Sequence, residues 1–96
     1  MTMYVLAQLT ITDRTRYNRY QAAFLDVLHR YGGTLLAADE HPEVIEGSWP
    51  HHKVVLLAFD DRQQFARWSR SPEYTRIALD RKAGSDAVVL LTEGAQ

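Results

Sequence analysis

The chain has 96 residues, of which 46% are hydrophobic and 24% charged, and its formal net charge is −1. This length and composition indicate one globular domain with a modest core, a size at which oligomers are common. The near balance of charge argues against a nucleic-acid binder, which usually carries a basic surface. The absence of cysteine excludes a disulfide framework, a thiolate metal site and a cysteine nucleophile. No leader peptide or membrane-spanning apolar run is present, so we expect a cytoplasmic protein that does not bind membranes.

The first third of the sequence predicts a strand followed by a helix. Residues from Met3 to Ile11 alternate with a period of two, and one face of this segment is fully apolar. Asp13 then offers an oxygen that can cap a helix. Apolar residues next recur at steps of three and four, as on one buried helical face: Tyr17, Tyr20, Phe24, Val27, Leu28 and Tyr31. Gly32-Gly33 is expected to end this helix.

Two further strands flank a long turn in the middle of the chain. Thr34–Ala38 predicts a strand, and Glu43–Glu46 a short extended piece that either continues it past a bulge or forms an edge strand. The turn that follows, from Gly47 to Pro50, is rich in Gly and Pro. Lys53–Phe59 is almost entirely apolar, which indicates a strand that is buried on both faces.

The last third predicts two short helices and a final strand. Asp60-Asp61 can cap a helix whose inner face carries Phe65 and Trp68. Ser71-Pro72-Glu73 is typical of a second helix start, with a capping serine, proline at the first helical position and an acid in the first turn. Gly84 is expected to end that helix before an apolar strand at Ala87–Leu91.

This order of elements predicts an α+β fold of the ferredoxin-like type. A βαββαβ chain forms a four-stranded antiparallel sheet with both helices on one face. Two helices cover only one face, yet Lys53–Phe59 and Ala87–Leu91 are apolar on both. Because large exposed apolar faces usually mark an interface, we expect a homodimer in which two sheets pack face to face.

Five short segments, in their order and spacing, resemble the family of domain of unknown function 1330. These segments are Tyr4-Val5-Leu6-Ala7-Gln8, the pair Tyr17 and Tyr20, Tyr31-Gly32-Gly33, Glu46-Gly47-Ser48-Trp49-Pro50 and Ser71-Pro72-Glu73-Tyr74. The resemblance extends from Met3 to Gly94 and implies a single domain of the dimeric α/β-barrel superfamily. It implies little about activity, because no residue set here matches the monooxygenases, haem-degrading enzymes or peroxidases that share this architecture.

The turn before the apolar strand carries the candidate catalytic residues. Glu46 and Trp49 are candidates for a carboxylate and an aromatic lid of one pocket, although Trp49 alternatively plugs the end of the sheet. His51 or His52 is a candidate general base, because imidazole titrates near neutral pH. Adjacent residues entering a strand point to opposite sides, so at most one of the two faces a pocket. Two solvated histidines are the alternative, which we favour.

Tyr74 and Gln8 complete the candidate ligand-binding set, together with Trp49. Tyr74 follows a helix start whose free amides suit an anion, although Ser71 and Glu73 can satisfy that end themselves. Arg76 and Arg81 are considered for holding a carboxylate, but helical arginines are usually solvated. The four histidines lack metal-ligand spacing, and no motif indicates a cofactor, so we expect neither.

Two functions of different classes remain open, beside a third interpretation as a haem-binding relative, which predicts visible absorbance of the purified protein. The first is a small-molecule binder or cofactor-free enzyme that performs acid/base chemistry on a small organic acid or aromatic compound, in a pocket between sheet and helices. The second is a non-catalytic dimeric binding or assembly module. The first requires the polar candidate residues to converge on one concave pocket.

Overall fold

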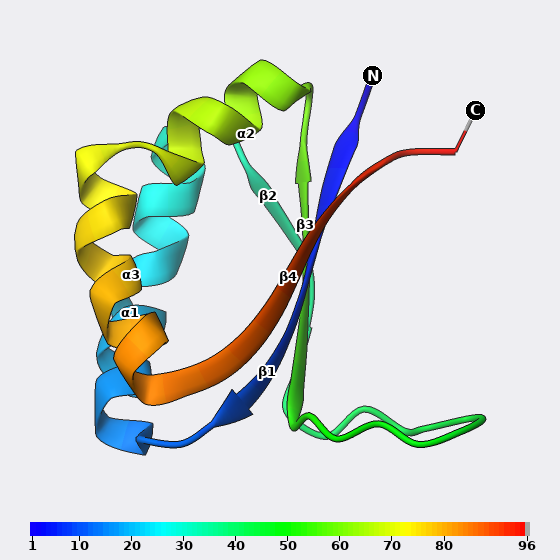
Figure 1. Ribbon diagram of the computed structural model, residues 1–96. Helices are drawn as coiled ribbons and strands as arrows, with labels where there is room; N and C mark the ends of the chain where they lie inside the picture. Colours follow the sequence, from blue (N-terminus) through cyan, green and yellow to red (C-terminus); the bar gives the residue numbers. More distant parts are fainter. Residues whose placement is uncertain (96) are drawn as a thin grey trace.

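The computed structural model describes residues 1–95 as one sheet with three helices packed on one side (Figure 1). In chain order, the elements are β1 (Met3–Ile11), α1 (Arg14–Arg30), β2 (Thr34–Asp39), β3 (Lys53–Phe59), α2 (Arg62–Ser69), α3 (Pro72–Gly84) and β4 (Ser85–Glu93). The sheet is antiparallel, with strand order β2-β3-β1-β4. The predicted ferredoxin-like βαββαβ fold is confirmed, with its second helix divided into α2 and α3.

The caps and turns that bound the helices are those that the sequence predicts. Asp13 accepts a hydrogen bond from the Arg16 amide at 3.2 Å and begins α1. The left-handed conformation of Gly32, with φ of 80°, lets the chain leave α1 toward β2. At the other two starts, the side chains of Asp61 and Ser71 cap α2 and α3.

The core lies between the helices and one face of the sheet. In register, Val5 and Leu9 of β1 lie beside Leu57 and Lys53 of β3, and all four side chains are buried. Tyr17 of α1 and Trp68 of α2 are among the buried rings that meet this face. Other members of the core are Tyr20, Phe24, Val27, Leu28 and Phe59.

The second face of the sheet has no helix over it. Figure 1 shows all three helices on the same side of the strands. The strand period of two places Leu6 of β1, Leu56 of β3 and Leu90 of β4 on the uncovered face, where these three residues are neighbours in register. Leu90 is 48% exposed. We call this surface, the one opposite the helices, the free face.

The extended piece expected at Glu43–Glu46 is absent from the sheet among residues 1–95, so that prediction was wrong. Residues 40–52 instead form a long loop that projects away from the helices (Figure 1). The Asp39 side chain accepts from the His41 amide at 2.8 Å and turns the chain out of β2, and Pro42 has no N–H for a strand ladder. The bulge itself lies earlier, between Leu35 and Ala37. No helix within residues 1–95 is long and apolar enough to cross a bilayer.

Candidate functional site

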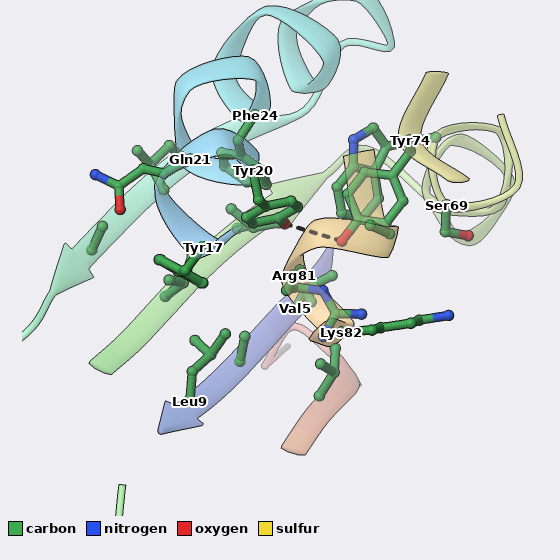
Figure 2. Close-up of a pocket in the computed structure, with 18 of the residues that line it drawn as sticks. Val5, Leu9, Tyr17, Tyr20, Gln21, Phe24, Ser69, Tyr74, Arg81 and Lys82 are labelled. Carbon is green, nitrogen blue, oxygen red and sulfur yellow. Dashed lines mark hydrogen bonds between the residues drawn. The ribbon is translucent and has the colours of Figure 1, made fainter. Parts of the chain in front are cut away.

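A cavity of about 530 Å³ lies between the helices and the sheet (Figure 2). Its walls are mostly apolar and come from β1, β3, α1, α2 and α3. Exposed lining residues mark two openings: Leu79, Lys82 and Val89 at the side of α3 and β4, and Leu25 and Ala38 at the side of α1 and β2. A ligand can therefore enter from solvent while most of its surface contacts apolar walls.

Three tyrosines place hydroxyl groups at this cavity. Tyr20 of α1 and Tyr74 of α3 join their hydroxyls at 3.1 Å, as Figure 2 shows, and Tyr74 also stacks against Trp68 with ring centres 4.0 Å apart. Burial raises the pKa of Tyr17 to about 12, with the negative charge of Glu40 adding to the effect. Burial also raises the pKa of Tyr20 well above its ordinary value. These buried phenols are neutral at physiological pH and act as hydrogen-bond donors.

The charged groups of the cavity wall are all cations. Arg81, Lys82 and Lys53 line the cavity, and no Asp or Glu of residues 1–95 does. The Arg81 charge acts on the phenols of Tyr17 and Tyr20, where it opposes the rise in pKa that burial causes. Its Nε is buried and forms no hydrogen bond within the described chain. Arg81 therefore has donor capacity to offer to an anion.

Lys53 lies at the first position of β3 and is 6% exposed. Its Nζ donates to Gln21 Oε1 at 3.1 Å and lies 4.9 Å from the centre of the Tyr17 ring. Burial lowers the pKa of Lys53, and the charge of Glu40 partly opposes this. The amine is thus held by one amide oxygen and one aromatic ring at the edge of an apolar space.

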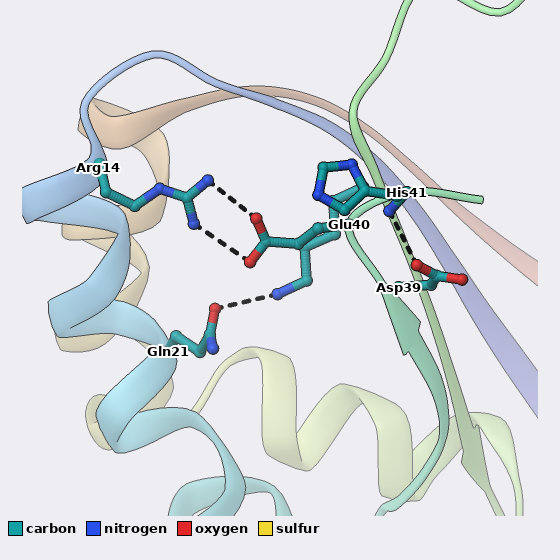
Figure 3. A network of polar contacts seen from close by, with 6 residues as sticks. Arg14, Gln21, Asp39, Glu40 and His41 are labelled. Atoms are coloured by element: carbon teal, nitrogen blue, oxygen red, sulfur yellow. Dashed lines mark hydrogen bonds and ion pairs between the residues drawn. The ribbon is translucent and has the colours of Figure 1, made fainter.

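The carboxylate of Glu40, which acts on Lys53 electrostatically, forms its ion pair with Arg14. Figure 3 shows Arg14 in a two-pronged contact with its carboxylate, at 3.1 and 2.9 Å. This contact lowers the pKa of Glu40, and Lys53 contributes less to the same effect. Glu40 and Lys53 form no ion pair within residues 1–95. Arg14 therefore keeps Glu40 from neutralising the amine by direct contact.

The residues chosen from the sequence divide between the two faces of the sheet. Tyr74 lines the cavity. Gln8, Glu46 and Trp49 line a shallow groove of about 450 Å³ on the free face, together with the projecting loop. There the Trp49 Nε1 donates to Gln8 Oε1 at 2.7 Å. The set therefore does not converge on one pocket, although three of its members lie together. The condition stated for a small-molecule function is not met by these residues, so such a function has to rest on other residues of the cavity.

The two histidines differ in exposure and contacts. His51 is half-buried, with its ring 5.9 Å from that of Trp49 and its Nδ1 3.1 Å from the Thr10 hydroxyl. His52 is exposed, and its backbone amide donates to Leu9 O at 2.8 Å. Neither histidine lines the helix–sheet cavity. Within residues 1–95, no three His, Cys, Asp or Glu side chains are grouped so that they could hold a metal.

Sequence reasoning missed two of the residues that matter most at the cavity. Arg81 was judged to be solvated, and Lys53 was grouped with its apolar strand. The position of Lys53 could have been predicted from the strand period of two. Lys53 lies on the same face of the strand as Val55, Leu57 and Phe59, and therefore points to the helices. For Arg81, helical spacing alone gave no such indication.

The chain matches the family described as Domain of unknown function (DUF1330) over residues 2–95. It belongs to this family. The resemblance noted from the five segments is thereby confirmed. No curated protein matches the chain.

Solved structures with the same fold are distant in sequence. A protein of unknown function from Rhodopseudomonas palustris superposes with a TM-score of 0.84 at 15% identity, covering 99% of this chain and 83% of that one. A dimeric ferredoxin-like protein of unknown function from Jannaschia sp. CCS1 has a TM-score of 0.74 at 18% identity, with 98% and 100% covered. SnoaB, a cofactor-independent oxygenase from Streptomyces nogalater, has a TM-score of 0.71 at 15% identity, with 99% and 94% covered. At these identities the likeness shows the fold alone.

Proposed function

We propose that this protein binds a small organic acid with an aromatic or otherwise apolar body in the helix–sheet cavity. On this proposal it is a cofactor-free enzyme that performs acid/base chemistry on that acid. One observation carries the proposal: the cavity combines apolar walls with Arg81, Lys53 and Lys82, and no carboxylate among the described residues lines it. A half-desolvated guanidinium without an acid beside it favours an anionic partner, since charge is costly to bury unpaired.

The phenols suit the same class of ligand. Because burial keeps Tyr17 and Tyr20 protonated, their hydroxyls can donate to a carboxylate or to an oxygen on which negative charge develops during reaction. Trp68 and Phe65 provide aromatic surface for the body of the ligand. The chemistry that fits is proton transfer on a substrate that passes through an enolate or phenolate. The cofactor-independent oxygenase of the same fold is in keeping with cofactor-free chemistry here.

We further propose that the working unit is a homodimer in the cytoplasm, with the two free faces in contact. Val88 and Leu90 of β4 are 45% and 48% exposed and lie on this face with Leu6 of β1. Ile45, at 80% exposed, extends the apolar surface onto the projecting loop. The ferredoxin-like protein from Jannaschia, which has the same fold and is dimeric, supports a dimer here.

Ligand binding tests the proposal through one arginine. We expect benzoate to raise the melting temperature of the protein, because a ligand that binds only the folded state stabilises it by mass action. Benzamide, which has the same shape without the charge, should shift it far less. Arg81→Gln should weaken benzoate binding about tenfold to a hundredfold, the range for losing a charged hydrogen bond. Isothermal titration calorimetry measures this loss.

The control is Arg76→Gln, on the same helix but exposed and outside the cavity lining. It should leave benzoate affinity unchanged. Two results would contradict the assignment of Arg81 as an anion receptor. One is equal affinity for benzoate and benzamide; the other is an equal loss of benzoate affinity in Arg81→Gln and Arg76→Gln.

A non-catalytic dimeric assembly module is the second candidate function. The observation that favours it is the Gln8–Trp49 hydrogen bond, which orders an aromatic side chain on the free face rather than in the cavity. If small carboxylates, phenols and lactones all fail to shift the melting temperature while the dimer is intact, this second function becomes the better account.

A further inference from the structure

Lys53 is a charged residue on the helix-facing side of the sheet, where its neighbours are apolar. Val55 and Leu57 follow it on the same face of β3, and Leu9 lies beside it on β1. Its side chain is among the buried polar groups of the protein, at 6% exposed, yet it lines the cavity. The only other lysine of the sequence is Lys82, which is exposed at the opening beside β4.

The Nζ of Lys53 has only part of its hydrogen-bonding capacity in use. Among residues 1–95 its one hydrogen-bond acceptor is Gln21 Oε1, whereas an ammonium has three N–H donors. The Tyr17 ring below it offers a cation–π contact but no lone pair. The carboxylate of Glu40 is held by Arg14, as Figure 3 shows beside Gln21.

These surroundings favour the neutral amine more than water does. Burial lowers the pKa of Lys53, and a lysine that is desolvated in an apolar site is a known route to a nucleophilic amine. A purely structural lysine would be expected to pair with an acid or to extend its charge to water. Lys53 forms no ion pair within residues 1–95, is 6% exposed, and lines a cavity of about 530 Å³, which is large enough for an aromatic ring.

We propose that Lys53 is a nucleophile that forms an imine with an aldehyde or ketone held in the cavity. The inference rests on the proposed function, in which the cavity binds an organic acid. It narrows that ligand class to an oxo acid, with its carboxylate at Arg81 and its carbonyl at Lys53. Such an imine would serve as an electron sink for proton removal at the neighbouring carbon.

The step balances without an oxidant or a reductant. The nitrogen lone pair of the neutral amine attacks the carbonyl carbon, and the C=O π pair moves to oxygen, which takes up a proton. The nitrogen then loses a proton to give a neutral carbinolamine. Its hydroxyl takes up a second proton and leaves as water, while the nitrogen lone pair forms the C=N bond of a protonated imine. Hydrolysis reverses the sequence and returns the free amine.

Reductive trapping of the wild-type protein tests this chemistry. Benzaldehyde and 4-formylbenzoate are each added with cyanoborohydride, which transfers hydride to an imine and makes the adduct permanent. Peptide mass spectrometry then follows labelling at Lys53, at Lys82 and at the amino terminus. We expect Lys53 to label several-fold faster than Lys82 in the folded protein, and this preference to vanish in concentrated urea.

Two matched variants accompany the test. Lys53→Arg keeps the positive charge but cannot form an imine, so it should abolish the urea-sensitive labelling. Arg76→Gln, which is exposed and outside the cavity lining, should leave labelling of Lys53 unchanged. Labelling of Lys82 as fast as Lys53 in the folded protein, or a preference that persists in urea, would overturn the assignment.

Benzoate protection separates this inference from the function on which it rests. If benzoate binds but Lys53 is not labelled preferentially, the anion-binding cavity stands and the imine chemistry fails. If Lys53 labels preferentially with benzaldehyde and benzoate neither binds nor protects, the nucleophile stands and the organic-acid proposal fails. Protection of a preferentially labelled Lys53 supports both.

Discussion

Gly84 lies where the end of α3 meets the start of α1. A Cβ at this position would lie 2.7 Å from the Tyr17 amide nitrogen and 2.9 Å from the Asp13 carbonyl oxygen, which are backbone atoms that cannot swing away. Its own carbonyl accepts from the amides of Thr12 and Asp13 at 2.9 and 3.1 Å. The absent side chain thus permits the close approach that fixes α1 against α3, and with it Tyr17 at the cavity.

Gly84→Ala should therefore destabilise the protein, although alanine is the better helix former. We expect a loss of about 1–3 kcal/mol in the free energy of unfolding, the usual cost of forcing extra volume into a packed site. Urea denaturation measures it. The exposed neighbour Ala83 provides the control: Ala83→Ser should change stability by less than about 0.5 kcal/mol. A neutral Gly84→Ala would show that the two helices can separate at no cost.

At the residue scale, the sequence predicted those contacts that join residues close together in the chain. The cap at Ser71 and the glycine after α1 were predicted, because each acts on backbone groups within a few positions. Arg81 was undervalued, because only the packing of α3 against α1 decides that its guanidinium faces the phenols of Tyr17 and Tyr20. The Gln8–Trp49 bond joins residues 41 positions apart, and no periodicity reports such a contact.

The junction of α2 and α3 shows how one side chain joins two elements. The Ser71 hydroxyl donates to Trp68 O at 2.8 Å and accepts from the Tyr74 amide at 3.0 Å. It therefore adds a second hydrogen bond to the Trp68 carbonyl, which already accepts from the Ser71 amide, and it satisfies an orphan amide at the start of α3. Because Trp68 and Tyr74 are also the stacked rings of the cavity wall, the same hydroxyl positions part of the candidate site.

Ser71→Ala should cost about 1–2 kcal/mol of stability, the range for losing a helix cap, and it should weaken benzoate binding as well. The serine is 4% exposed, so water cannot readily replace both bonds. Ser69→Ala is the matched control for stability, because its hydroxyl makes one long bond of 3.4 Å to Ala66 O. Since Ser69 itself lines the cavity, the two variants are compared by thermal unfolding. Thermal unfolding and titration with benzoate are the two measurements. Equal effects of the two substitutions would argue against the bridging role.

At the scale of elements, the βαββαβ order was predictable because each strand and helix carried a local signal of its own: a period, an apolar run or a capping residue. The projecting loop was not, because Glu43–Glu46 has strand-like residues, and local pattern does not report that the chain turns away from the edge of the sheet before reaching them. Its Val44 and Ile45 are 46% and 80% exposed. Their exposure follows from the turn at Asp39, which directs the chain away from the helices before these residues are reached.

In the molecule as a whole, the sheet separates two surfaces with different chemistry. The helix side encloses a cavity with cationic and phenolic groups, whereas the free face is apolar and carries Gln8 and Trp49 at its edge. The strand period explains this division, since neighbouring residues of one strand serve opposite surfaces. Substitutions at adjacent positions can therefore test the two surfaces independently.

Val89 and Leu90 of β4 provide that test, because each is 48% exposed and they point to opposite faces. Val89 lines the cavity, and Leu90 lies on the free face beside Leu6. Leu90→Asp should give a monomer in sedimentation velocity at micromolar concentration, because a face-to-face dimer would bury the carboxylate without a partner. Val89→Asp should remain dimeric and instead lose benzoate affinity, because it places a negative charge in a cavity that favours anions. The proposal that the free face is the dimer interface would be wrong if the wild-type protein were a monomer. It would also be wrong if Leu90→Asp formed a dimer as stable as that of the wild type. In either case, exposed Val88 and Ile45 would lack the partner proposed for them.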